Sequence, residues 1–431
     1  MTRVATSLKK QTFLLALGNG YTRCLGFFLR LALARQLGAQ ALGVMEMTGS
    51  VTMLALTPVT AGTASAVSRL TAKRPACDQP QVLLAARSLV LRAALVLVPA
   101  LLMLAPLLAR LLGEMRTAPG LVCAAPAIAL LGLCTVYSGW HYGRGETRLP
   151  ALCECAEQTV RCLLALGLTA LFHAAPVAWR AALPQAAESA AALCSVLLMM
   201  RASPLPPRPH MPSAALRRQI FRLCVPAMLS RLCVTGTRAL NAVLLPACLR
   251  LSGLSAEAAT AQFGLLSGMA MPLMLLPSIL TGALGMVAAP ALSAREERPK
   301  ELRRVMRRML NGAVLAGGGC TLLLLLGADV IALLYRTPEL SPVVRWLSPA
   351  ALLFALHQVM CGMIAGLGLQ RRALTGTVLS SAASLCLTAL LARLPGVRIF
   401  GALLAQLAGQ AMQLAWDAVL LSRALHAQRK G

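Results

Sequence analysis

The chain has 431 residues, of which 58% are hydrophobic and 13% are charged, and its formal net charge is +27. A soluble domain carries about 25% charged residues, so this composition excludes a soluble enzyme, a disordered chain and a secreted disulfide scaffold. In an apolar chain such an excess of cations indicates one face of a membrane rather than nucleic acid.

Twelve apolar runs are long enough to cross a bilayer, because a spanning helix needs about 20 residues. We predict spans near 12–36, 41–72, 84–112, 120–143, 150–173, 176–200, 218–246, 257–293, 305–335, 342–368, 373–394 and 399–424. Several runs exceed 25 residues, which predicts tilted or kinked helices. The expected fold class is therefore an all-α integral membrane protein of about 12 transmembrane helices.

The distribution of cations predicts the orientation. If the N-terminus is cytoplasmic and the chain alternates sides, 26 of the 41 Lys and Arg residues fall on cytoplasmic ends and loops and 9 on the opposite side. This asymmetry follows the positive-inside rule. It predicts that both termini lie in the cytoplasm.

Two halves of the chain resemble each other. A stretch at 201–217 with five prolines cannot continue a helix and predicts a cytoplasmic linker between bundles at 1–200 and 218–431. Three glycines recur at a constant offset of 223 residues: Gly139, Gly143 and Gly145, then Gly362, Gly366 and Gly368. Six spans per half predict a parallel repeat about an axis along the membrane normal.

Four arginines within spans also follow the repeat, and the members of each pair lie seven positions apart: Arg23 and Arg30, then Arg231 and Arg238. A charge at the bilayer centre costs about 2.5–3.5 kcal/mol on insertion scales, so these side chains are expected to avoid lipid. We predict that Arg23 and Arg231 face a central cavity, where guanidinium groups bind an anionic group such as a pyrophosphate. The alternative is that each pairs with a helix-end carbonyl or a buried acid; Arg30 and Arg238 could also snorkel outward.

Deep acids are fewer. Glu154, Glu157 and Arg161 share one face of a predicted helix, and the spacing of Glu157 and Arg161 favours an ion pair. This face either holds spans together or couples transport to an ion. Asp417 is predicted to be a proton or sodium site, or the partner of a buried Arg.

Prolines interrupt several spans. Pro58, Pro226 and Pro277 are predicted hinges, with static packing kinks as the alternative. The 14 cysteines lie mostly within apolar runs, so we interpret them as small apolar residues of the membrane helices. The five histidines are scattered without a ligand partner at useful spacing, and no P-loop or catalytic triad is found, so we expect no enzyme, metal or cofactor.

Four segments resemble the stage V sporulation protein B group, in the polysaccharide transport branch of the multidrug/oligosaccharidyl-lipid/polysaccharide (MOP) flippase superfamily. They lie at 22–43, 139–161, 263–294 and 361–373, the third reading FGLLSGMAMPLMLLPSILTGALGMVAAPALSA. The resemblance implies two six-helix bundles in a V shape that move lipid-linked sugars by alternating access. It also implies that Arg23 and Arg231 correspond to cavity arginines of lipid II flippases. No thirteenth or fourteenth span, which several relatives possess, is found in this chain.

The sequence therefore predicts a flippase in the bacterial cytoplasmic membrane. Its expected substrate is an undecaprenyl-pyrophosphate-linked glycan precursor for peptidoglycan, a polysaccharide or the spore cortex, and its expected partners are membrane lipids and cell-wall synthases. Coupling would come from protons, sodium or the membrane potential. The alternatives are a multidrug exporter of the same superfamily, which would favour deep acids, and a non-transporting scaffold for cell-wall synthesis. A membrane transferase would need an acidic metal motif that the cytoplasmic loops lack.

Overall fold

The computed structural model describes residues 2–203, 213–278 and 299–427, together with residues 281, 282, 284, 285, 288 and 292. Within these ranges every regular element is a helix. Contacts divide the chain into two compact units, Met1–Ala239 and Leu240–Gly431. Most of the predicted linker, residues 204–212, lies outside the described residues.

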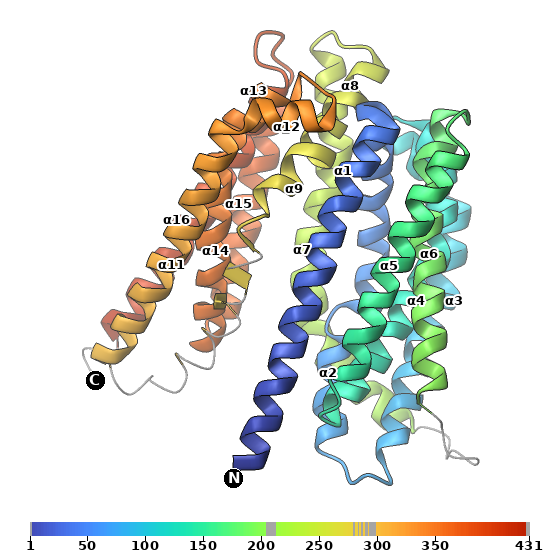
Figure 1. Ribbon diagram of the computed structural model, residues 1–431, viewed down its shortest axis with the longest axis vertical. Helices are drawn as coiled ribbons and strands as arrows, with labels where there is room; N and C mark the ends of the chain where they lie inside the picture. Colours follow the sequence, from blue (N-terminus) through green and yellow to red (C-terminus); the bar gives the residue numbers. More distant parts are fainter. Residues whose placement is uncertain are drawn as a thin grey trace. The chain divides into compact units, whose positions relative to one another are not determined.

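The first unit contains six long or medium helices and the first part of a seventh (Figure 1). They are α1 (Thr2–Thr60), α2 (Thr63–Ala72), α3 (Gln79–Leu111), α4 (Ala118–Gly143), α5 (Arg148–Leu171), α6 (Val177–Arg201) and α7 (Ala214–Leu251), with a short 3₁₀ turn η1 (Met115–Thr117) before α4. Helix α4 packs against α2, α3 and α6, and α5 packs against α1 and α6. Leu83, Ile128 and Tyr137 are fully buried at the centre of the core.

The second unit begins within α7. Its further elements are α8 (Ala256–Phe263), the π-helical segment η2 (Gly264–Ala270), α9 (Met271–Met274), α11 (Pro299–Leu326), α12 (Ala328–Tyr335), α13 (Leu340–Leu347), α14 (Pro349–Gly366), α15 (Gln370–Leu391) and α16 (Ile399–Ala427). Helix α14 packs against α11 and α16, and α16 also packs along α15. Leu302, Ala313 and Met363 lie in the core of this unit.

Eight helices among the described residues are long and apolar enough to cross a membrane. The first of them, Leu17–Ala72, covers most of the predicted span 12–36 and all of the predicted span 41–72. Gly38 interrupts α1 with a positive φ of 76°, a conformation that glycine adopts without strain. Helix α1 is therefore two helices that meet at Gly38.

Two predicted spans are divided by the structure. The run 305–335 becomes α11 and α12, separated at Gly327, and the run 342–368 becomes α13 and α14, joined at Ser348. In each case the short helix lies at the end that was predicted to be outside. Hydropathy alone merged the pairs, because the residues at which the helices separate, Gly327 and Ser348, are small and uncharged and do not interrupt an apolar run.

The repeated glycines have the same local roles in each unit. A Cβ on Gly139 would lie 2.5 Å from the carbonyl oxygen of Ala64, and a Cβ on Gly362 would lie 2.2 Å from that of Gly285. Both glycines therefore allow two helix backbones to approach closely, as small residues do in membrane helices.

The C-terminal ends of α4 and α14 are capped alike. Gly145 (φ 76°) donates its N–H to the carbonyl of Tyr142, and Gly368 (φ 69°) donates to that of Ala365. In both, the following residue donates to the carbonyl five positions back, which completes a Schellman motif. Matching local geometry at a constant offset supports the duplication; superposition of the two halves stays a prediction.

Candidate functional site

Helices α1 and α5 pack side by side in register. The thiols of Cys155 and Cys162 lie 3.9 and 3.8 Å from the carbonyl oxygens of Gly18 and Leu25, respectively. Between them, the hydroxyl of Tyr21 lies 2.8 Å from that of Thr159. These contacts fix the rotation of α1, and with it the face that carries the predicted arginines.

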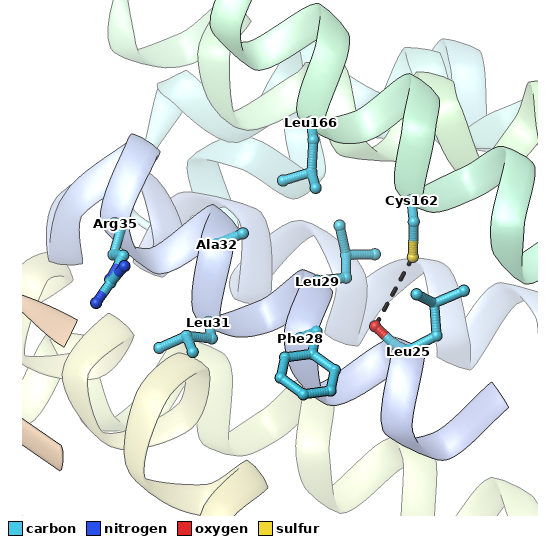
Figure 2. Close-up of a pocket in the computed structure, with 8 residues that line it drawn as sticks. All are labelled: Leu25, Phe28, Leu29, Leu31, Ala32, Arg35, Cys162 and Leu166. Carbon is cyan, nitrogen blue, oxygen red and sulfur yellow. Dashed lines mark hydrogen bonds between the residues drawn. The ribbon is translucent and has the colours of Figure 1, made fainter. Parts of the chain in front are cut away.

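A shallow apolar pocket of about 300 Å³ lies along the same helix pair. Figure 2 shows Leu25, Phe28 and Leu29 from α1 beside Cys162 and Leu166 from α5. The lining is almost entirely apolar, with one cation, Arg35, at its end. Such a lining offers few polar partners to a charged ligand.

Three of the four predicted arginines come together in the first unit. The guanidinium of Arg30 lies 2.8 Å from the carboxylate of Glu46. Arg238 on α7 interacts electrostatically with Glu46, Arg30 and Arg231. The remaining predicted residue, Arg23, lies seven positions before Arg30 on α1 and is exposed, as are Arg231 and Arg238.

A buried hydroxyl pair holds α7 against α1 at this level. The Oγ1 atoms of Thr57 and Thr235 are 3.1 Å apart, and Thr235 lies midway between Arg231 and Arg238 in the sequence. The arginines of α7 are thus placed by the first unit, to which this part of α7 belongs. Whether Arg23 and Arg231 face one cavity stays a prediction.

Glu46 was missed by the sequence reasoning. It is the single acidic residue in the first 77 positions, and its place inside an apolar run was a usable signal. It supplies one negative charge to a group of three guanidiniums, so the group formed by Arg30, Arg231, Arg238 and Glu46 carries a net charge of +2. We call these four residues the arginine cluster.

The predicted polar face of α5 has a different partner from the expected one. Arg161 pairs with Glu188 on α6 at 3.3 Å, across two helices, rather than with Glu157 one turn away. Glu157 is half-buried, with the thiol of Cys134 at 3.9 Å, and Glu154 is exposed. The i,i+4 spacing permitted a pair within α5, but the packing of α5 against α6 brought a second carboxylate to Arg161.

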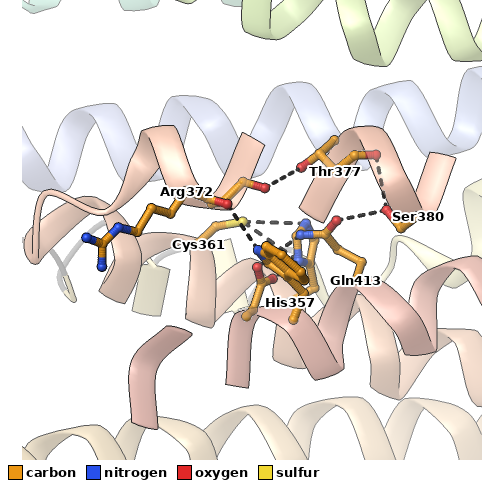
Figure 3. Close-up of polar contacts among 9 residues, drawn as sticks. His357, Cys361, Arg372, Thr377, Ser380 and Gln413 are labelled. Carbon is orange, nitrogen blue, oxygen red and sulfur yellow. Dashed lines mark hydrogen bonds and ion pairs between the residues drawn. The ribbon is translucent and has the colours of Figure 1, made fainter. Parts of the chain in front are cut away.

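Asp417 in the second unit is fully buried and pairs with a histidine. Its Oδ2 atom lies 2.8 Å from Nδ1 of His357, and its Oδ1 atom accepts a hydrogen bond of 3.0 Å from Gln413. Gln413 in turn accepts from the hydroxyl of Ser380 at 2.9 Å (Figure 3). Among the described residues, Asp417 therefore pairs with His357, so the prediction of a buried Arg as its partner is wrong. The sequence alone indicated no partner for His357.

The three predicted hinge prolines have different surroundings. Pro58 lies four residues before Gly62, where the chain breaks between α1 and α2. Pro277 lies in a turn after α9. Helix α7, in contrast, continues through Pro226, as membrane helices can do when neighbouring groups satisfy the freed carbonyl.

Both the sequence and the fold of the chain are similar to those of known proteins. Residues 8–296 match the model of the family described as polysaccharide biosynthesis protein. The chain is 26% identical to stage V sporulation protein B of Bacillus subtilis (strain 168) over 441 residues, covering 97% of this chain and 84% of the relative.

Two solved structures illustrate the fold. An inward-facing multidrug resistance MATE family transporter of the MOP superfamily has a TM-score of 0.81 at 15% identity, covering 95% of this chain and 96% of the other. The lipid II flippase MurJ in an inward closed conformation has a TM-score of 0.73 at 12% identity, covering 95% and 87%. The chain therefore belongs to the polysaccharide biosynthesis protein family and is a multi-pass membrane protein with the fold of the MOP superfamily transporters.

Proposed function

We propose that this protein is a flippase that moves an undecaprenyl-pyrophosphate-linked glycan precursor across the bacterial cytoplasmic membrane. The observation that carries the proposal is the arginine cluster, in which Arg30 pairs with Glu46 and Arg238 interacts electrostatically with both of them and with Arg231, within apolar helices. A net positive group in such surroundings is best completed by an anion. A diphosphate suits it, because each guanidinium offers a planar pair of donors to phosphate oxygens.

The cluster also suggests how the substrate is held and released. In the structure Glu46 occupies one face of Arg30. A diphosphate that binds Arg231 and Arg238 competes with Glu46 for Arg30, so binding and release exchange one anion for another. This exchange avoids leaving a bare charge in the apolar interior, which is the costly state.

Alternating access then exposes the cluster to each side in turn, with the breaks near Pro58 and Pro277 as hinges and both termini in the cytoplasm. Protons, sodium or the membrane potential would drive the cycle, and Glu157 and Glu154 on α5 are our candidates for the coupling group. Cell-wall synthases are the expected users of the translocated precursor, for peptidoglycan, another polysaccharide or the spore cortex.

Charge separates this proposal from a multidrug exporter of the same superfamily. A pocket for cationic drugs needs deep carboxylates, whereas the arginine cluster has three cations to one acid. A scaffold without transport would need no anion site at all.

The test uses purified protein in detergent and lipids that differ only in their head. Undecaprenyl pyrophosphate should bind, and undecaprenol, which has no charge, should bind at least tenfold more weakly. Arg231→Ala and Arg238→Ala should each weaken binding of undecaprenyl pyrophosphate by about tenfold or more, since a charge-assisted hydrogen bond contributes about 1.5–3 kcal/mol. Arg92→Ala, an exposed cation on α3 of the same unit, is the matched control.

A complementation assay tests transport itself. Arg23→Ala and Arg231→Ala should abolish growth of a flippase-deficient strain, and Arg23→Lys should restore it in part. Normal growth with both alanine variants at wild-type membrane levels would contradict the proposal. Equal binding of undecaprenol and undecaprenyl pyrophosphate would contradict it independently.

A further inference from the structure

A histidine and a cysteine lie one helical turn apart on α14. The Sγ atom of Cys361 lies 3.4 Å from Nε2 and 3.8 Å from Nδ1 of His357 (Figure 3). Cys361 is exposed and His357 is about one-third exposed. Both donor atoms are therefore reachable from outside the helix packing.

The separation of these two atoms fits a shared metal ion. Zinc bonds of about 2.0–2.1 Å to nitrogen and about 2.3 Å to sulfur, at a tetrahedral angle, put the two donors about 3.5 Å apart. The observed 3.4 Å matches this separation, and the 3.8 Å from the same sulfur to Nδ1 shows that the thiol lies beside the ring, so chelation requires a rotation of the Cys361 side chain toward the Nε2 lone pair. The i,i+4 spacing on a rigid helix maintains it, since such positions lie on one face.

Asp417 supplies the support that metal-binding histidines use. Its carboxylate contacts the other ring nitrogen, Nδ1, at 2.8 Å, an arrangement in which Nδ1 donates to the carboxylate and an ion takes the place of the proton on Nε2. The carboxylate is itself fully buried and held by the amide of Gln413. A thiol, an imidazole and this carboxylate are the one group of metal-ligating side chains found together among the described residues.

We propose that His357 and Cys361 chelate a soft divalent transition metal ion, Zn²⁺ being the type case, and that Asp417 orients the imidazole. Thiolate and imidazole donors select zinc or copper over magnesium and calcium, which prefer oxygen. The two remaining positions are open to water or an external ligand, as in sites that exchange their metal. The site lies wholly in the second unit, so it is independent of the arginine cluster and of the proposed transport.

The first experiment follows protection of the thiol. Full-length protein in detergent is stripped with a chelator, titrated with Zn²⁺ and exposed briefly to N-ethylmaleimide, and alkylation of each cysteine is read by peptide mass spectrometry. Zn²⁺ should slow alkylation of Cys361 by about tenfold or more and leave Cys386, an exposed cysteine on α15 of the same unit, unchanged. His357→Gln should remove this protection.

The second experiment reads the ligands directly. Co²⁺ should give a thiolate-to-metal absorption band that Cys361→Ser removes and Cys386→Ser retains. Asp417→Asn should weaken Zn²⁺ binding by about 10–100-fold, as loss of an orienting carboxylate does. His357→Gln and Cys361→Ser keep the test decisive if Asp417→Asn fails to fold.

Three results would overturn the proposal: equal protection of Cys361 and Cys386, protection that survives His357→Gln, or no protection at all. In the last case, fast alkylation of Cys361 that depends on His357 would identify a thiol activated by the imidazole instead of a metal ligand.

Discussion

The carboxylate of Glu46 lies 2.8 Å from the guanidinium of Arg30, although sixteen residues separate them in the sequence. In one continuous helix they would be about 24 Å apart. The contact therefore requires the chain to fold back at Gly38, so this ion pair both closes a helical hairpin and neutralises one cation of the arginine cluster.

Removing the acid should lower stability. Glu46→Gln keeps the shape of the side chain but leaves Arg30 without its countercharge, at a cost of about 1 kcal/mol because the pair is partly exposed. Arg30→Met in the same chain should recover part of the loss, since no unpaired guanidinium remains. Thermal unfolding in detergent measures both, with Glu339→Gln, an exposed acid at the start of α13, as the control; equal melting of all variants would contradict the pair's role.

Close backbone packing at the repeated glycines should be sensitive to a single methyl group. Gly139→Ala and Gly362→Ala place a Cβ at 2.5 and 2.2 Å from a backbone oxygen, so each should destabilise by about 1–3 kcal/mol through overpacking. Gly167→Ala on α5 and Gly318→Ala on α11 are matched controls with nothing within 4 Å of the new Cβ. These should be neutral or stabilising, because alanine favours helix more than glycine does. Loss of stability in the controls alone would show that the packing argument is wrong.

The two helix caps should respond alike to substitution. At Gly145 and Gly368 the backbone has positive φ with open space around the Cβ position, so the cost of alanine is conformational, about 1 kcal/mol. Asparagine tolerates this conformation better and should cost less. Melting temperatures of the four single variants test this ranking of alanine below asparagine. Steric crowding would give the opposite ranking, because asparagine is the larger residue.

The ion pair between α5 and α6 should show energetic coupling. Arg161→Met or Glu188→Gln alone leaves a partly buried charge, whereas the double variant leaves none. A double-mutant cycle on unfolding should therefore give a coupling energy of about 0.5–3 kcal/mol, and a cycle with Glu157→Gln in place of Glu188→Gln should give less. A larger coupling for Glu157 would restore the pair expected from the i,i+4 spacing.

The contact between α12 and α13 through Asp329 and Arg345 should depend on pH. Asp329 on α12 lies beyond the spanning segment Lys300–Leu326. Two groups on α13 hold the pKa of its carboxyl below the usual value: first the hydroxyl of Ser341, which donates a hydrogen bond to it, and then the guanidinium of Arg345. A depressed pKa means that the link between α12 and α13 is present above the ordinary Asp pKa of about 3.9 and is lost only as the pH falls through the lower folded value.

Tryptophan emission offers a readout, because Trp346 follows Arg345 on α13 and packs on Phe400. Asp329→Asn should change the emission by the same amount at pH 5 as at pH 8, since the wild-type carboxyl is ionised at both. An effect that disappears at pH 5 would show that the pKa of the carboxyl is raised, and an effect that is halved near pH 4 would show that the pKa is ordinary; either result contradicts the prediction. Trp346→Phe isolates the signal from the other tryptophans.

The sequence by itself determined the class of protein, most of the helical segments and the repeated positions. These follow from one-dimensional quantities: the length of apolar runs, the placement of cations and the spacing of glycines. Arg23, Arg30, Arg231 and Arg238 were found in this way, because a charge inside a span is conspicuous wherever the helix faces.

Only the tertiary structure decided which side chains meet. Arg161 pairs with Glu188 instead of Glu157, Arg30 pairs with Glu46 after the reversal at Gly38, and Asp417 pairs with His357 from another helix. A helix presents several faces, and the rotation that selects one is fixed by packing against neighbours far away in the chain. The spacing of His357 and Cys361 was visible in the sequence. The carboxylate that orients His357 belongs to Asp417 on α16, 60 residues further along the chain, and only the fold brings the two together.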